Sequence, residues 1–327
     1  MPMLLAEGFD VTGLDTCFYG DGHLTDTQPS SYPVLQKDVR DVIREDLEGF
    51  DAVIHLAALS NDPLGCLDES LTFEINFKGS VRVAEAARAA GVQRFILASS
   101  CSLYGAADKV VTEDDEANPQ TAYGKSKVMA ENAISALVTE SFSPIFMRNA
   151  TAFGVSSRMR FDLVVNNLAG YAQTEGSIKI MGDGTPWRPL VHIRDIAAAC
   201  IAALRQDKAA VHNQAFNVGD DRENYQIKAI AHQIKNYYPD CEITIAQKNA
   251  GDTRNYRVGF TKLKDRLQFQ TTVRLDDGIA EIHKAYTSIP LTTPVFNHRL
   301  YTRLKQIQWL LREGRINAAL RWTKDDV

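Results

Sequence analysis

The chain has 327 residues, which is enough for one large α/β domain or two smaller ones. Its formal net charge is −5, it contains no lysine- or arginine-rich run, and a nucleic-acid partner is therefore not expected. No stretch reaches the roughly 20 apolar residues that span a bilayer, and the N-terminus lacks the pattern of a signal peptide, so no membrane partner is expected either.

Apolar strands alternate with helical patterns through the first half of the chain, which indicates βαβ units and a parallel sheet. The predicted strands cover 11–14, 34–36, 52–56, 94–98 and 144–147. The predicted helices cover 71–90, which Gly91 would end, and 121–138.

The order of elements is unusual at the front of the chain. Residues 1–8 have the pattern of the last two turns of a helix, closed by Gly8 as a C-terminal cap. A dinucleotide-binding fold opens instead with a strand, a Gly-rich turn and a helix whose N-terminus holds the pyrophosphate. The expectation is a reading frame that starts upstream, with Met1 an internal methionine. The alternative is a genuinely short protein with weakened cofactor binding.

The second half continues with mixed helix and strand patterns. The predicted elements are a helix over 161–172 bearing Asn166 and Asn167, a strand over 178–180 before the turn 182–184, a helix over 193–204, a strand over 215–218, and helices over 227–237, 276–286 and 300–312. No repeat or flexible linker separates two lobes, so the lobes are expected to be interleaved.

The cysteines are scattered and odd in number, without a C-x-x-C pair, so the sequence predicts no metal site and a reducing, cytoplasmic location. They are Cys17, Cys66, Cys101, Cys200 and Cys241. For Cys101, next to Ser100, a packing role is expected over a reactive thiol.

Two segments about twenty residues apart carry the strongest chemical signal. Ser100 ends an apolar strand, and Tyr123 and Lys127 are four residues apart, which places them on one helix face. There the Lys127 ammonium is expected to stabilise a phenolate and lower the pKa of Tyr123, so that the phenol exchanges a proton near neutral pH. Ser100 would hydrogen-bond the substrate oxygen that exchanges its proton with Tyr123. The three predict a hydride-transfer site; for the Tyr–Lys spacing alone, a solvated helix face is the alternative.

With these segments, the chain resembles the extended short-chain dehydrogenase/reductase superfamily, in its NAD-dependent sugar-nucleotide epimerase/dehydratase branch. The resemblance runs from residue 1 to about residue 285, and its further landmarks are 13–15, 37–41, 54–58, 76–79 and 187–192. It implies an α/β fold with a Rossmann-like doubly wound parallel sheet, lacking its first strand and Gly-rich loop, and a smaller, interleaved α/β substrate-binding lobe.

The resemblance also implies a division of the chain. The NAD-binding domain would comprise residues 1–155 and 191–218. The substrate-binding lobe would comprise 156–190 and 219–290, and a C-terminal helical extension would follow over 291–327.

NAD is the cofactor that the resemblance implies. Asp15 ends a strand, where its carboxylate can accept both adenosine-ribose hydroxyls and repel a 2′-phosphate. Asp38 and Val39 resemble the family's adenine-binding pair, with a helix N-cap as the alternative for Asp38. The remaining implied cofactor contacts are Leu56, Ala57, Ala58, Asn76, Ser99, Tyr123 and Lys127. Asn76 resembles a family residue that ties the active-site strands together, and His55 is expected to be a buried core histidine.

By resemblance, Asn167 and Arg188 would meet the diphosphate of a nucleotide sugar, because a guanidinium donates bidentate, charge-assisted bonds. A surface arginine is the alternative for Arg188. The other implied substrate contacts are Ser100, Thr151 and Arg254. The chain departs from UDP-galactose 4-epimerases at two positions. Thr151 replaces an asparagine, and Asn249 replaces an arginine whose charge Arg254 could supply. Structural roles are expected for His192 and Asp195.

The implied activity is epimerisation of a nucleotide-diphosphate sugar, at C4, by transient oxidation to a keto-sugar. The runner-up is a 4,6-dehydratase, but the family's dehydratases carry an acidic residue or pair where this chain has Cys101 and Ser102. A keto-sugar reductase also stays open, as does a protein of another class: a non-catalytic nucleotide-binding protein or an inactive truncated form. The chain is expected to bind a nucleotide-diphosphate sugar, and a homodimer is possible.

Overall fold

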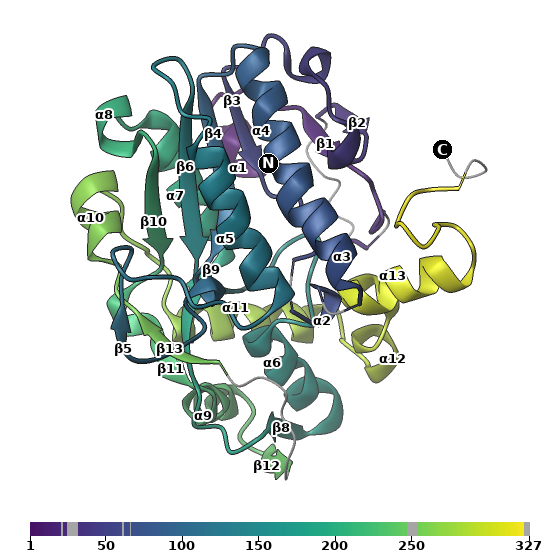
Figure 1. Cartoon of the computed structure of the whole chain (residues 1–327). Coiled ribbons are helices and arrows are strands. Elements are labelled where there is room, and N and C mark those ends of the chain that lie inside the picture. The colour runs from purple at the N-terminus through teal and green to yellow at the C-terminus, as the bar shows by residue number, and fades with distance from the viewer. Residues whose placement is uncertain (21, 25–31, 61, 66, 247–253, 324–327) are drawn as a thin grey trace.

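The structure is a computed structural model, and it describes residues 1–20, 22–24, 32–60, 62–65, 67–246 and 254–323 (Figure 1). The α-helices are α1 (Pro2–Ala6), α2 (Asp62–Gly65), α3 (Glu69–Thr72), α4 (Ser80–Ala89), α5 (Ala122–Ser135), α6 (Val164–Glu175), α7 (Ile193–Arg205), α8 (Lys208–Val211), α9 (Ile227–Tyr237), α10 (Thr261–Leu267), α11 (Leu275–Ser288), α12 (Thr293–Phe296) and α13 (Arg303–Arg312). The strands are β1 (Gly13–Asp15), β2 (Val34–Gln36), β3 (Ala52–His55), β4 (Arg94–Ser100), β5 (Ala106–Val111), β6 (Ser143–Asn149), β7 (Thr151–Phe153), β8 (Ser177–Met181), β9 (Trp187–His192), β10 (Gln214–Val218), β11 (Asn224–Gln226), β12 (Glu242–Ala246) and β13 (Asn255–Val258).

The strands predicted in the first half form parallel sheet, but in two pieces. The larger piece has the order β10-β6-β4-β3, and all its pairs are parallel. Within the described residues, β1 pairs only with β2, and β3 pairs only with β4. The predicted α/β, Rossmann-like class is confirmed, and the sheet is divided between β1 and β3.

Helices cover both faces of the larger sheet. In Figure 1, α4 and α5 lie in front of the strands and α7 lies behind them, next to α1. Glu7, directly after α1, pairs with Arg205 of α7 at 2.7 Å. Gly8 has φ +83°, the conformation expected of a C-terminal helix cap.

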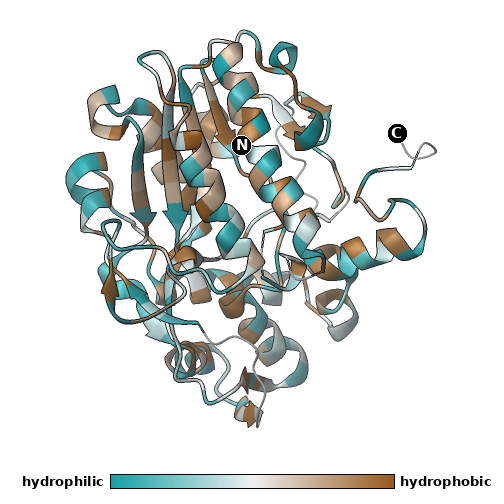
Figure 2. Ribbon diagram, viewed as in Figure 1, coloured by the Kyte–Doolittle hydropathy of each residue, from teal (hydrophilic) through white to brown (hydrophobic). Residues whose placement is uncertain are grey.

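The buried strands explain why this sheet is stable. Phe95, Ile96 and Leu97 of β4 are fully buried, as are Ile145 of β6 and Phe216 of β10. Such unbroken apolar runs are typical of parallel strands covered on both faces. Figure 2 shows the hydrophobic residues along the central strands, while the helices in front carry both colours. No helix in the described ranges is long and apolar enough to cross a membrane.

A second group of short strands and helices surrounds the carboxyl ends of the sheet. Strand β9 pairs parallel with β7 and antiparallel with β11, and the parallel pairs β8–β12 and β5–β13 complete this part. Its apolar core packs α6, α9 and α11 together through residues such as Val165, Ile230, Ile234, Ile279 and Ile282. Most of these strands pair across long stretches of sequence, and of them the sequence predicted only β8.

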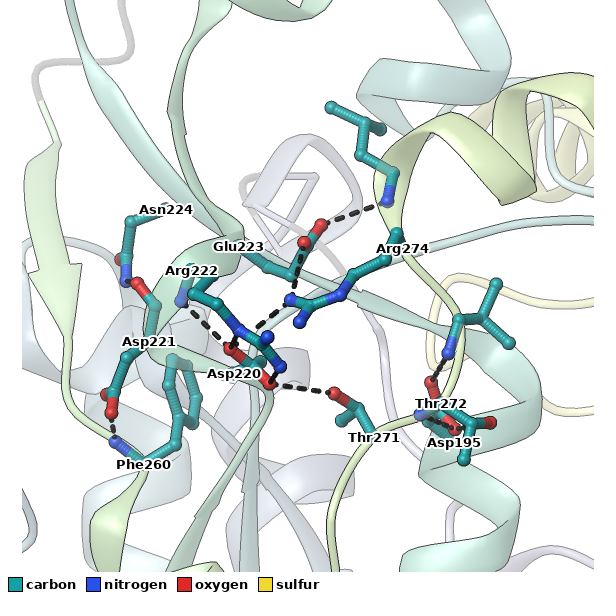
Figure 3. A network of polar contacts seen from close by, with 12 residues as sticks. Asp195, Asp220, Asp221, Arg222, Glu223, Asn224, Phe260, Thr271, Thr272 and Arg274 are labelled. Atoms are coloured by element: carbon teal, nitrogen blue, oxygen red, sulfur yellow. Dashed lines mark hydrogen bonds and ion pairs between the residues drawn. The ribbon is translucent and has the colours of Figure 1, made fainter.

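Acidic side chains hold the start of α11 against α7 and the 3-10 turn η5 (Asp221–Glu223) (Figure 3). Asp195 of α7 accepts hydrogen bonds from the backbone nitrogens of Thr272 and Val273, at 3.0 Å each. Glu223 is buried and accepts from the Leu275 nitrogen at 3.0 Å. The structural role expected for Asp195 is therefore what the structure shows.

Several predicted boundaries were wrong. The helix predicted over 71–90 is not uniform, because a π-helical segment, η3 (Phe73–Gly79), separates α3 from α4. Strand β1 begins at Gly13 instead of residue 11, and α6 begins at Val164 instead of 161, since Phe161 packs its ring into the core. The helix predicted from residue 300 begins at Arg303, after the short 3-10 turn η6 (Arg299–Tyr301).

Candidate active site

Ser100, Tyr123 and Lys127 meet at the carboxyl end of β4. Ser100 is the last residue of that strand, and Tyr123 lies in the first turn of α5. Thr121 caps this helix by accepting a hydrogen bond from the Gly124 nitrogen at 3.2 Å. The Ser100 side chain lies close enough to the Tyr123 phenol to act on its pKa, and the Lys127 Nζ lies 5.9 Å from the centre of the tyrosine ring. The structure thus brings the predicted trio together.

The lowered pKa that the sequence predicts for Tyr123 is not what the structure shows. Burial raises the pKa of Tyr123, and the Ser100 side chain only opposes that rise. The Lys127 ammonium donates to the carbonyl oxygen of Ala98 at 2.7 Å. The prediction of a lowered Tyr123 pKa is therefore wrong for this structure, because burial of the phenol is the largest contribution.

A buried polar network stands behind Lys127. Burial lowers the pKa of Lys127 to about 8, while the carboxylate of Glu131, one turn along α5, raises it. Glu131 accepts a hydrogen bond from the Ser99 hydroxyl and pairs with Arg148 at 2.8 Å. The Arg148 guanidinium donates in turn to the hydroxyl of Tyr104 at 3.0 Å. The Ser99 side chain, predicted to contact cofactor, is thus directed at Glu131.

Asn76 connects the loop after β3 to the catalytic helix. Its amide exchanges two hydrogen bonds with the backbone of Leu59, at 2.7 and 3.1 Å, and donates to the Ser126 hydroxyl at 3.3 Å. Ser126 donates to the Tyr123 carbonyl oxygen at 2.7 Å. Asn76 lies in the π-helical segment η3, a feature that is frequent at functional sites. Asn76 therefore ties a loop to the catalytic helix, whereas a link between the active-site strands was expected of it.

The loop after β3 presents backbone and small side chains at the edge of the sheet. Leu56 is 61% exposed, and Ala57 and Ala58 are half-buried. His55, just before them, is buried and hydrogen-bonds the Ser80 hydroxyl at 2.9 Å. Burial lowers the pKa of His55 to about 3, so it is a neutral core histidine, as expected.

The residues predicted to hold adenosine follow β1 and β2. Asp15 is exposed, and its carboxylate accepts a hydrogen bond from the Cys17 nitrogen at 2.7 Å. Asp38 caps the 3-10 turn η1 (Val39–Asp41) by accepting from the Arg40 nitrogen at 2.8 Å, and it pairs with the Arg40 guanidinium at 2.6 Å. Val39 is buried. In this structure Asp38 therefore has the alternative, N-capping role.

The residues at the two ends of the proposed cofactor site fit NAD. An exposed carboxylate, Asp15, suits the adenosine ribose, and the phenol and ammonium of α5 suit the nicotinamide end. For the pyrophosphate between them, the described ranges contain no glycine-rich turn that links a strand to a helix. The fit of the site to NAD therefore depends on the residues at its adenosine and nicotinamide ends.

The predicted substrate residues Arg188 and Arg254 are adjacent. Arg188 is only 7% exposed, so the surface alternative is wrong, and it donates to the carbonyl oxygens of Trp187 at 2.8 Å and Arg254 at 2.6 Å. Arg254 pairs with Asp62 at 2.5 Å. Asp62 also accepts from the hydroxyl of Thr121, the cap of α5, at 2.6 Å.

Sequence reasoning missed Arg160 and Asp62, two charged residues that act on the Tyr123 phenol. The charges of Arg160 and Arg254 act to lower the pKa of Tyr123 and that of Asp62 acts to raise it. Arg160 pairs with Asp162 at 2.9 Å and donates to the Ser60 hydroxyl at 3.2 Å. One signal for Asp62 was available, since it follows β3 at the carboxyl edge of a parallel sheet, where ligands bind.

The remaining predicted substrate residues have weaker geometric support. The Asn167 amide donates to the Phe161 carbonyl oxygen at 2.8 Å, which fixes the loop before α6. Thr151 is the half-buried first residue of β7. Asn249 lies outside the described residues. His192 caps α7 and contacts Glu281 at 3.1 Å, in keeping with a structural role.

Cys101 is fully buried beside Ser100, and its thiol contacts the Arg148 carbonyl oxygen at 3.0 Å. Burial raises the pKa of this thiol well above its usual range, so it stays protonated and inert. The structure therefore supports the packing role expected for Cys101.

A sequence model of the NAD dependent epimerase/dehydratase family matches residues 1–219. The chain belongs to this family. It is accordingly an NAD-dependent enzyme of the epimerase/dehydratase type, with NAD as cofactor.

Named relatives and solved structures extend this result. The chain is 30% identical to the UDP-glucose 4-epimerase of Mycolicibacterium smegmatis over 295 residues, covering 85% of this chain and 91% of the relative. It is 28% identical to the UDP-glucose 4-epimerase of Corynebacterium glutamicum over 288 residues, covering 81% and 84%. The structure of an NAD-dependent NDP-hexosamine 5,6-dehydratase from tunicamycin biosynthesis has the same fold, with a TM-score of 0.78, 20% identity and coverage of 88% and 92%. So does the UDP-glucose 4-epimerase of Thermotoga maritima, with a TM-score of 0.77, 21% identity and coverage of 88% and 94%.

Proposed function

We propose that this protein is an epimerase of nucleotide-diphosphate sugars that acts at C4 through a transient keto-sugar. The observation that carries the proposal is the meeting of Ser100, Tyr123 and Lys127 at one edge of the parallel sheet, where the Ser100 side chain lies close enough to the Tyr123 phenol to act on its pKa. Support for epimerisation comes from the two relatives named UDP-glucose 4-epimerase.

Each residue of the trio has a separate task in this proposal. Tyr123 takes the proton of the sugar 4-hydroxyl and later returns it, Ser100 holds the same oxygen, and Lys127 favours the phenolate through its charge. NAD, when bound, accepts a hydride from the sugar carbon and gives it back. Return to the opposite face of the keto-sugar inverts C4 without net redox change.

The surroundings of Ser100 disfavour dehydration, which needs an acid and a base to remove water from the sugar. Cys101 and Ser102 stand between Ser100 and Tyr104, both are buried, and neither is a carboxylate. The Ser102 hydroxyl is instead bonded with that of Ser100 at 2.9 Å. A dehydratase or a keto-sugar reductase is therefore the lesser candidate.

The guanidinium groups of Arg188 and Arg254 would recognise the diphosphate of the substrate. Uridine is the proposed nucleoside, because the named relatives are UDP-glucose 4-epimerases. A cytoplasmic location is part of the proposal, since Cys17, Cys101 and Cys200 are free thiols, which a reducing compartment maintains. A homodimer is also proposed, and light scattering would test it.

Product analysis with a panel of nucleotide sugars tests the proposal. UDP-glucose, UDP-galactose, UDP-glucuronic acid and dTDP-glucose are each incubated with the NAD-loaded protein, and the products are separated and assigned by NMR. The expected product is a C4 epimer, without accumulation of reduced cofactor. A 4-keto-6-deoxy product would identify a dehydratase, and net consumption of added NADH would identify a reductase. No product from any sugar would refute catalysis on this panel.

A further inference from the structure

The C-terminal part of the chain packs onto the loop that follows β1. We call residues 303–323 the C-terminal brace. The Trp322 indole donates a hydrogen bond to the Thr16 carbonyl oxygen at 2.6 Å, and the buried Gln306 amide donates to the Phe18 carbonyl oxygen at 2.8 Å. The rings of Trp322 and Phe18 are in contact, with 5.6 Å between centroids. Thr16 directly follows Asp15, so these bonds fix the backbone next to the proposed ribose-binding carboxylate.

The same segment also holds the loop that follows β2. The Arg40 guanidinium donates to the carbonyl oxygens of Ala319 at 2.8 Å and Leu320 at 3.1 Å, while it remains paired with Asp38. Arg321 pairs with Asp41 and lies 3.4 Å from Asp38. Two guanidinium groups therefore tie Asp38, the cap of η1, to the brace.

The brace is part of the core and is not a loose tail. Ile307, Leu310, Ile316 and Leu320 are at most 2% exposed, and they belong to the apolar cluster that contains Val39. In Figure 1 the brace, which begins with α13, lies on the side of the molecule that carries β1 and β2. Its removal would therefore uncover the cluster beneath η1.

The two braced loops have little other support from the sheet. In the described residues, β1 and β2 pair only with each other, so no backbone ladder connects them to β3. A ligand binds a preformed site more tightly, because less ordering free energy is spent on binding. When only a fraction of molecules has competent loops, the apparent dissociation constant rises by the inverse of that fraction.

We propose that the C-terminal brace completes the adenosine half of the NAD site, with Arg321 and Trp322 as positioning residues for the loops at 15–19 and 38–41. The inference rests on the proposed function only in that it needs NAD at these loops. It does not depend on which sugar the protein converts.

The test uses the full chain with Arg321→Ala and Trp322→Phe, the latter keeping an aromatic ring, though a smaller one, and removing the indole N–H. The matched control is Arg312→Ala, because Arg312 is in the same segment but is exposed and pairs only with its neighbour Glu313 in the described ion pairs. NAD affinity is measured by calorimetry on NAD-depleted protein. Each test variant is expected to raise the NAD dissociation constant about threefold to thirtyfold, as lost hydrogen bonds of these kinds do, and the control is not.

Hydrogen exchange gives a second readout that needs no substrate. The loops at 15–19 and 38–41 should exchange faster in both test variants, while α5 should be unchanged. Because coupling is reciprocal, NAD should also slow exchange in residues 315–323 of the wild-type protein. If a test variant does not fold, this wild-type protection still decides the matter.

NAD affinity within twofold of wild type in both test variants, or no protection of 315–323 by NAD, would overturn the inference. Wild-type protein that binds NAD but converts no sugar would refute the proposed epimerase and leave the brace standing. If the wild-type protein converts a sugar and the variants keep their NAD affinity, the proposed function stands and the inference about the brace is refuted.

Discussion

The catalytic edge and the adenosine edge of this molecule are held in different ways. At the catalytic edge, β4 pairs with β3 and β6, and a polar network from Asn76 to Arg148 fixes α5 on the sheet. At the adenosine edge, β1 and β2 form a separate pair whose following loops are bonded to the C-terminal brace. One edge is ordered by the continuous sheet, and the other by residues about 300 positions along the chain.

This difference predicts how substitutions at the two edges behave. At the catalytic edge, changes should alter turnover or global stability, because the groups are buried in the main sheet. At the adenosine edge, changes should alter NAD affinity and local order with less effect on turnover at saturating NAD. The following experiments test that contrast, in decreasing order of expected effect.

Tyr123→Phe should lower turnover about 10²- to 10⁴-fold, the usual contribution of a positioned acid–base group, because it removes the exchangeable proton and keeps the ring. NAD binding should be retained. The measurement is initial rate with the active nucleotide sugar, together with cofactor content. Activity within about threefold of wild type would remove Tyr123 from the chemistry.

Glu131→Ala should lower the free energy of unfolding by about 3–5 kcal/mol, because it leaves the guanidinium of Arg148 buried without its partner. The control is Glu48→Ala, which removes an ion pair with Arg44 whose side chains are at least half exposed, and which should change stability by less than about 1 kcal/mol. Urea unfolding measures both. Equal losses in the two variants would show that the network behind Lys127 contributes nothing special.

Asp15→Asn should weaken NAD binding by about 1.5 kcal/mol or somewhat more, the typical value of a hydrogen bond to a charged group. It should also reduce the ratio of NAD affinity to NADP affinity, because the carboxylate that repels the 2′-phosphate is gone. Turnover at saturating NAD should stay near that of wild type. Calorimetry with both cofactors measures the two affinities. A large fall in turnover with unchanged affinity would contradict the separation of the two edges.

The catalytic trio could be predicted because its information is local. The spacing of Tyr123 and Lys127 on a helix, and an apolar strand before Ser100, follow from short-range rules. The contacts that hold the rest of the candidate site are not local. The brace, the pairing of β5 with β13, and the ion pair of Asp62 with Arg254 join residues that no periodic pattern in the sequence connects.

The wrong expectations have the same origin. The pKa of Tyr123 was expected to be lowered, but burial raises it, and burial depends on tertiary packing that the spacing of Tyr123 and Lys127 does not show. The π-helical segment around Asn76 breaks the helical period that the prediction assumed. The division into 1–155 with 191–218, 156–190 with 219–290, and 291–327 stays a prediction. The brace adds that part of the last segment shares a core with the first.

The smallest expected effect concerns the pH dependence of catalysis. Lys127 has a pKa of about 8, lowered by burial, so its ammonium, which the phenolate needs, is lost as the pH rises through that value. Tyr123, whose pKa is raised, must lose its proton and so favours higher pH. The pH profile of kcat/KM should therefore be bell-shaped, and its two apparent pKa values belong to the coupled pair.

Glu131→Gln separates these two contributions. The carboxylate of Glu131 raises the pKa of Lys127, which lies below that of Tyr123 and so sets the lower of the two apparent pKa values. The neutral replacement should move this lower apparent pKa downward by about one unit or less, worth about 1.4 kcal/mol at most. The matched control is Glu113→Gln: burial raises the pKa of Glu113, which accepts a hydrogen bond from the Asn217 nitrogen, and Glu113 is not among the charges that act on Lys127. The control should leave the lower apparent pKa in place. A lower apparent pKa that moves upward, or moves equally in both variants, would show that the ammonium of Lys127 does not set it, and the charge of α5 would then have no part in the chemistry at Tyr123.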